Sequence, residues 1–136
     1  MTSTLDFPVT QAPPAAAVTL LRQAELGFAA VSPDAAPAHL FTESYLCALR
    51  AAAALLSARG RPHRGRAKPT SVWTLMSSVA PEMREWAAFF ASCSATRAAV
   101  QAGITSRVGP RAAEDLHRHV AEFITLVHRA VHGSGR

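Results

Sequence analysis

The stretch that decides the fold is AHLFTESYLCALRAAAALLSA, residues 38–58. Its apolar side chains recur at steps of three and four residues, which is the spacing of one face of an α-helix. These side chains are Phe41, Tyr45, Leu49, Ala52 and Leu56. The run AAAALL has high helix propensity and leaves a flat surface that another helix can approach closely. The sequence therefore predicts a long helix here that packs against other helices.

Helical spacing recurs on both sides of this stretch. It predicts helices from about residue 14 to the SPDAAP break at 32–37, a short one at about 71–79, and longer ones at about 81–102 and 110–132. Ser71, Pro81 and Pro110 stand where helices are expected to begin, with Ser32 and Asp34 as candidate caps before residue 38. Sustained strand alternation is absent from the sequence. The expected fold is all-α, an up-and-down four-helix bundle with one additional short helix.

The chain has the length of one ordinary domain, which we place at residues 14–132. Residues 1–13 are expected to be a disordered lead-in, 59–70 a basic loop between helices, and 133–136 a tail. The sequence has no uninterrupted apolar run of membrane-spanning length, and its first residues lack the pattern of a signal peptide. A cytoplasmic protein without a membrane partner is therefore expected. Cys47 and Cys93 lie within helical apolar patterns, which indicates buried core thiols rather than a disulfide or metal pair.

The positive charge of the chain is concentrated in one segment, residues 59–68. Its five cations are Arg59, Arg61, Arg64, Arg66 and Lys68. The chain has 14 Lys and Arg against 9 Asp and Glu, so without these five the two counts are equal at nine each. The segment could therefore neutralise phosphates of a nucleic acid. It contains no aromatic residue on which bases could stack, so a solvated loop remains the alternative.

Arginines and histidines inside the predicted helices form a second group of candidates. Arg50 and Arg97 each lie in mid-helix beside apolar residues, which favours ion pairs with acids on neighbouring helices or, alternatively, an anion site. His128 and His132 are one helical turn apart, but no acid follows to complete a metal site, so a surface pair is expected. No metal or other cofactor is predicted.

Residues 70–104, TSVWTLMSSVAPEMREWAAFFASCSATRAAVQAGI, carry a family resemblance. The order of Trp73, Pro81, Trp86 and the Ala102–Gly103 pair resembles a small stand-alone actinobacterial branch of the HEPN superfamily, the "higher eukaryotes and prokaryotes nucleotide-binding" domains. The flanking helices are similar as well, so the resemblance covers about residues 14–132. It implies a compact helical bundle that is commonly dimeric.

In active members of the superfamily, the resemblance implies metal-independent RNA cleavage by an Arg-x(4–6)-His motif whose two copies face each other across the dimer. Arg111 and His117 are one match, with histidine as general acid or base and arginine stabilising the phosphorane. A chain with this much arginine and histidine contains roughly one or two such matches by chance. Residues six apart on a helix also diverge by about 120°. A degenerate, non-catalytic domain is therefore favoured.

Three functions follow as hypotheses. The first is a non-catalytic module that binds RNA, a nucleotide or an accessory partner, and that forms a homodimer. The second is a metal-independent ribonuclease that uses Arg111 and His117. His119 cannot join His117 in such a site, because residues two apart on a helix point to roughly opposite faces. The third is a protein-interaction module, either an antitoxin-paired unit or an accessory subunit.

Overall fold

The computed structural model describes residues 12–60 and 69–133, with side chains from residue 72 onward in the second range. Its α-helices are α1 (Ala15–Ala30), α2 (Pro37–Ala58), α3 (Pro69–Val79), α4 (Arg84–Gln101) and α5 (Pro110–His132), with single 3-10 turns η2 (Pro81–Met83) and η3 (Thr105–Arg107). The described residues contain no strand, so the all-α prediction is confirmed. Most of the predicted lead-in, basic loop and tail lies outside the described residues.

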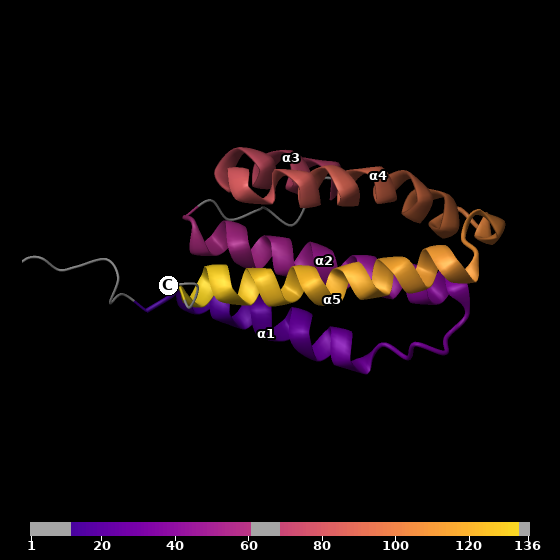
Figure 1. Cartoon of the computed structure of the whole chain (residues 1–136), viewed down its shortest axis with the longest axis horizontal. Helices are drawn as coiled ribbons and strands as arrows, with labels where there is room; N and C mark the ends of the chain where they lie inside the picture. Colours follow the sequence, from indigo (N-terminus) through magenta and orange to yellow (C-terminus); the bar gives the residue numbers. More distant parts are fainter. Residues whose placement is uncertain (1–11, 61–68, 134–136) are drawn as a thin grey trace, which may run out of the picture.

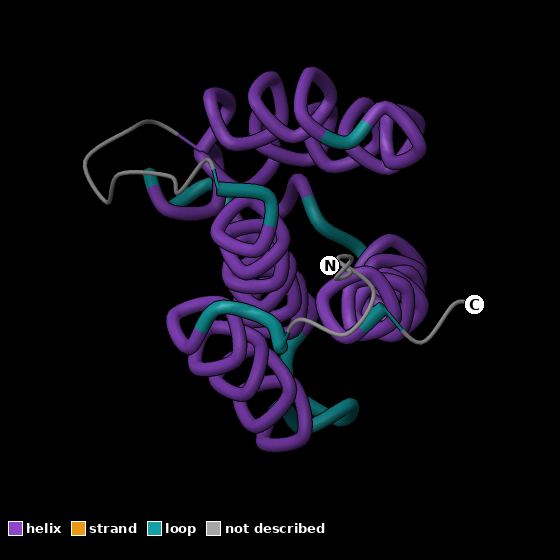
Figure 2. The backbone as a smooth tube through the Cα atoms, turned by 90° about the vertical axis from the view of Figure 1, so that its left-hand side faces the viewer, coloured by secondary structure: helices purple, strands orange, loops and turns teal. Residues whose placement is uncertain are grey.

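Helix α2 lies at the centre of the fold and packs against all four of the other α-helices. Figure 2 shows α2 with α1 on one side, α5 on another, and α3 and α4 together as a covering layer. The long helices α1, α2, α4 and α5 alternate in direction along the chain, as an up-and-down bundle requires (Figure 1). One detail goes beyond that expectation: α5 lies beside α2, and both run in the same direction.

The central place of α2 follows from its composition. A helix that is apolar around most of its circumference must be covered on most of its sides. Its buried residues are Leu40, Phe41, Ser44, Tyr45, Cys47, Ala48, Ala51, Ala52, Ala54, Leu55 and Leu56. The small alanines let neighbouring helices approach closely from several directions. By length and composition α2 could cross a membrane, but 61% of the relevant window is buried inside the fold, as in the core helix of a globular domain.

The helix ends differ from the sequence expectation at three places. Helix α3 begins at Pro69, so Ser71 lies inside the helix and does not precede it as a cap. Pro81 and Glu82 belong to the separate turn η2, and α4 begins only at Arg84. Proline needs no N–H partner, which suits it to the first position of either kind of helix.

The third difference concerns the start of α2. The helix has Pro37 at its first position and no side-chain cap. The hydroxyl of Ser32 instead accepts a hydrogen bond from the backbone N–H of Asp34 at 3.3 Å. The polar residues of this connection therefore stabilise a local turn and do not cap the helix.

An aromatic cluster joins the α3–α4 layer to the rest of the fold. The indole Nε1–H of Trp73 on α3 donates to the hydroxyl of Tyr45 on α2 at 2.8 Å, and both residues are at most 1% exposed. Trp73 stacks on Phe90 of α4 at a centroid distance of 4.8 Å. Phe90 in turn contacts Phe123 of α5 at 4.9 Å. Four helices thus meet at one set of rings.

Cys47 and Cys93 are both free and buried, as their helical patterns predicted. Burial raises the pKa of each thiol, because the charged thiolate is poorly solvated inside the fold. These thiols therefore belong to the core of the fold.

The hydrogen bond between Trp73 and Tyr45 should be measurable as stability. Tyr45→Phe keeps the ring but leaves the buried indole N–H without its acceptor, which we expect to cost about 1–3 kcal/mol in the free energy of unfolding. Urea unfolding followed by circular dichroism measures this change. The exposed substitution Thr19→Ala on α1 is the control, expected within about 0.5 kcal/mol. A Tyr45→Phe effect no larger than that of the control would show that the bond contributes little.

Candidate functional site

Arg59, the first cation of the basic segment, is held at the end of α2. Its Nη2 lies 2.6 Å from Oε2 of Glu82 in η2, and its Nη1 donates to the carbonyl oxygen of Val79 at 3.4 Å. The hydrogen bond from Arg59 to the carboxylate of Glu82 lowers the pKa of Glu82 below its ordinary value. Arg59 is thus already paired within the fold. The other four predicted nucleic-acid-binding cations, Arg61, Arg64, Arg66 and Lys68, lie outside the described residues.

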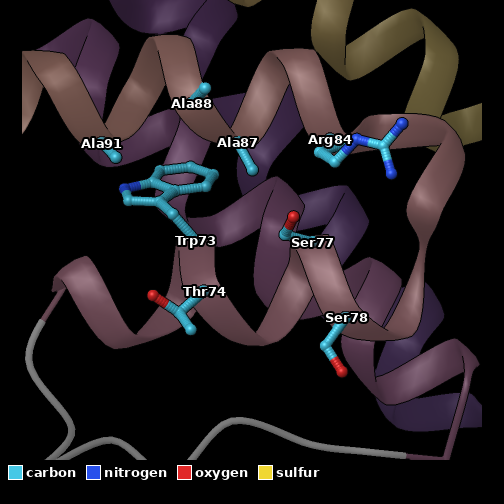
Figure 3. Close-up of a pocket in the computed structure, with 8 residues that line it drawn as sticks. All are labelled: Trp73, Thr74, Ser77, Ser78, Arg84, Ala87, Ala88 and Ala91. Atoms are coloured by element: carbon cyan, nitrogen blue, oxygen red, sulfur yellow. The ribbon is translucent and has the colours of Figure 1, made fainter.

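A groove of about 420 Å³ lies between α3 and α4, directly after the basic segment in the chain. Its lining residues are Trp73, Thr74, Ser77, Ser78, Arg84, Ala87, Ala88 and Ala91. Figure 3 shows Trp73 between the two helices, Arg84 at one end of the groove, and the hydroxyl of Ser77 directed toward α4. Hydroxyl groups therefore come from α3, and the small alanines and the guanidinium come from α4.

This lining is mostly apolar, and Arg84 at its end and the hydroxyl of Ser77 are its donors to an anionic group. A guanidinium binds phosphate oxygens through several N–H groups, and serine hydroxyls add donors at shorter range. The alanines of α4 leave room for a ligand to approach the helix closely. The sequence alone does not indicate this groove, because serines and alanines on a helix look like ordinary surface positions. A signal was present in the small residues that recur at helical spacing on both α3 and α4.

The predicted catalytic pair lies on α5 but not on one face of it. Arg111 is exposed in the first turn, whereas His117 is partly buried and stacks on Phe28 of α1 at a centroid distance of 4.5 Å. Residues six apart on a helix are separated by about 9 Å along its axis, and their side chains point in directions about 120° apart. Convergence of the two side chains would need a second chain. Their catalytic role stays a prediction.

The mid-helix arginines have neighbours other than the predicted acids. The guanidinium carbon of Arg97 lies 5.4 Å from the centroid of the Tyr45 ring, a cation–π contact. Its buried Nε has no hydrogen-bond partner among the described residues. Arg50 lies against α1, where a Cβ on Gly27 would come within 3.1 Å of its Nη1. Neither arginine forms an ion pair with a described carboxylate, and the anion-site hypothesis for both stays a prediction.

The histidines of α5 face different helices. His119 contacts Phe89 of α4 at a centroid distance of 5.0 Å, on the opposite side from His117 against α1, as the two-residue spacing predicted. His128 lies with its Nδ1 2.9 Å from Oε2 of Glu25 on α1. Sequence reasoning could not find this partner, because 103 residues separate the pair. Within the described residues no group of three His, Cys, Asp or Glu could hold a metal ion.

Comparison with known families agrees with this architecture. The sequence model of the SAV_6107-like HEPN family matches residues 29–128, from the end of α1 through most of α5. Because the match covers most of the chain, the protein belongs to this family of HEPN domains. No curated protein and no solved structure matches the chain.

The ion pair between Arg59 and Glu82 predicts a pH-dependent contribution to stability. Glu82 has a lowered pKa in the folded state, so the pair stabilises the fold above the ordinary value of 4.5 and loses this effect as pH falls through the folded-state pKa. Because both side chains are partly exposed, Glu82→Gln should cost only about 0.2–1 kcal/mol at pH 7.

Urea unfolding of the parent protein and of Glu82→Gln, in steps from pH 7 to strongly acid solution, measures this contribution. The difference between their free energies of unfolding should shrink toward zero as Glu82 becomes protonated. The exposed acid Glu114 on α5 serves as the control through Glu114→Gln. A difference that stayed constant across the whole pH range would contradict a role for the charge.

Proposed function

We propose that this HEPN-family protein is a cytoplasmic, non-catalytic RNA-binding module. In this proposal, the basic segment 59–68 holds RNA phosphates, and the groove between α3 and α4 receives the neighbouring part of the backbone. The observation that carries the proposal is the charge distribution: the whole formal excess of +5 corresponds to five cations within ten residues. Such a cluster binds phosphates by releasing their counterions.

The groove supports the proposal by its position and chemistry. Helix α3 begins at Pro69, immediately after Lys68, so the cations and the groove adjoin in the chain. Arg84 and the hydroxyl of Ser77 face the groove and offer donors that suit phosphate and ribose oxygens. No carboxylate is among the described residues that line it.

The non-catalytic part of the proposal is supported by α5. His117 is stacked on Phe28, and Arg111 lies in the first turn of the same helix on a different face. General acid–base catalysis needs the histidine within hydrogen-bond reach of the reacting hydroxyl, with the arginine near the same phosphate. Within one chain, the described geometry does not bring the two groups to a common point.

Electrophoretic mobility shift across a salt series tests the binding. For a single-stranded RNA, each phosphate contact contributes about −0.7 to the slope of log affinity against log salt. Changing Arg61, Arg64, Arg66 and Lys68 to Ser should therefore flatten the slope by roughly 2 to 3. Arg59→Ser should have a smaller effect, because Arg59 is already paired with Glu82.

A charge-matched control separates a local site from a general effect of charge. It changes four exposed arginines elsewhere to Ser: Arg22, Arg107, Arg118 and Arg129. This control should keep most of the salt dependence. Arg84→Ala in the groove should reduce the slope by the share of about one phosphate contact. Equal losses in both four-residue variants, or no loss in the segment variant, would refute the site.

The fate of the RNA tests the absence of catalysis. After prolonged incubation without divalent metal, the bound RNA should be recovered at full length on a denaturing gel. His117→Ala and Arg111→Ala should leave this result unchanged. Cleavage by the parent protein that both substitutions abolish would instead establish the ribonuclease alternative, with the pair completed across a dimer.

A further inference from the structure

A second concave surface, distinct from the α3–α4 groove, lies between α4 and α5. Two hollows of about 300 and 340 Å³ share Trp86 as a common wall. The first is lined by Glu85, Trp86, Phe89 and His119, and the second by Trp86, Glu122, Thr125, Leu126 and Arg129. We call these the aromatic hollow and the adjoining hollow.

Side chains of the aromatic hollow bridge two helices while staying partly exposed. The Trp86 and His119 rings have centroids 6.2 Å apart at 68°, and Phe89 and His119 lie 5.0 Å apart at 49°. Trp73, by contrast, is only 1% exposed. The inclined rings thus form walls at an angle to one another, and partial exposure leaves them accessible to a ligand.

The polar groups of the hollow favour a cation. Aromatic ring faces carry negative potential that attracts an organic cation, and the exposed carboxylate of Glu85 lines the same hollow. Nδ1 of His119 lies 2.7 Å from the backbone carbonyl of Asp115. Because a carbonyl only accepts, Nδ1 is the donor of this hydrogen bond and carries a proton.

A guanidinium is the cation that uses all of these groups. It is planar and stacks on aromatic rings, and its N–H groups can pair with a carboxylate through two parallel hydrogen bonds. The adjoining hollow adds the opposite charges of Glu122 and Arg129 and the apolar side chain of Leu126. RNA is disfavoured in the aromatic hollow, because the carboxylate of Glu85 lines it and would repel phosphates.

We propose that the aromatic hollow binds an arginine side chain presented by a basic segment of a partner protein. The flanking residues of that segment lie over Trp86 toward the adjoining hollow. The argument for this occupant is charge complementarity together with ring geometry. The site is independent of RNA binding by residues 59–68 and would make the domain an adaptor between two kinds of partner.

The two tryptophans of the chain provide the readout. In a ¹⁵N-labelled protein, each indole N–H gives its own signal, and Trp73 serves as an internal control because it is buried and bonded to Tyr45. Titration with the peptide acetyl-Ala-Arg-Ala-amide should shift the Trp86 indole signal to saturation and leave that of Trp73 in place. The same peptide with citrulline, a neutral isostere of arginine, should produce no saturable shift.

Two matched variants locate the charge. Glu85→Gln should weaken the peptide affinity by about threefold or more, because it removes the carboxylate and keeps the shape. Glu114→Gln, another exposed acid but on a different part of α5, should leave the affinity unchanged. Because Glu85 is exposed, its substitution should not compromise folding, whereas a substitution of Trp86 could.

Four results would overturn the proposal. The first is a Trp86 shift with the citrulline peptide that equals the shift with the arginine peptide, and the second is a peptide affinity of Glu85→Gln that equals that of the parent protein. The third is a Trp86 shift caused by single-stranded RNA and not by the peptide, and the fourth is a Trp86 signal that moves with protein concentration alone. The third result would reassign the surface to nucleic acid. The fourth would show that a second copy of the chain covers it.

Discussion

A buried indole N–H must find an acceptor, and this requirement organises the centre of the molecule. Tyr45 provides that acceptor for Trp73, which fixes α3 against the central helix α2. The Trp73 ring then supports Phe90 of α4, and the Tyr45 ring supports the guanidinium of Arg97 further along α4. This polar contact within an apolar cluster fixes the position of the covering layer of α3 and α4 together with the ion pair between Arg59 and Glu82.

The two proposed sites both depend on the placement of this layer. One face of α4, with Ala87, Ala88 and Ala91, forms the groove with α3, while Trp86 and Phe89 on another face meet α5. A single helix therefore separates a surface with a cationic end from one lined by rings and carboxylates. The difference in charge follows from α4 itself, because its consecutive residues Arg84 and Glu85 line the groove and the aromatic hollow respectively. The neighbouring helices add uncharged hydroxyl groups from α3, and His119 with the oppositely charged Glu122 and Arg129 from α5.

Local periodicity was sufficient to predict the helices and the all-α fold. The helical spacing of residues 38–58 and the proline at 110 placed α2 and α5 closely, because each helix has an apolar pattern and a clear start or end. Periodicity could not separate the 3-10 turn η2 from the helix α4, since a proline followed by an acid is compatible with either kind of helical turn. The central position of α2 was only implied by its alanine run.

The candidate sites were less predictable than the fold, because their residues come together from distant parts of the chain. Glu25 and His128 are 103 residues apart, and Tyr45 and Trp73 are 28 apart. No periodic pattern in a single sequence indicates such pairs. The basic segment was visible at once because its charges are contiguous. The aromatic hollow was not, because Trp86 and Phe89 have the same helical spacing as core residues and only the position of α5 shows that they remain partly exposed.

The ion pair between Arg59 and Glu82 has a consequence for how this domain can change during evolution. It ties the end of α2 to the turn before α4, while Trp73 fastens α3 to α2 independently. The chain between residues 60 and 69 is therefore anchored at both ends by contacts that do not involve it. A substitution at Arg59 or Glu82 therefore changes two things at once, the attachment of α2 to η2 and the charge at the start of the basic segment.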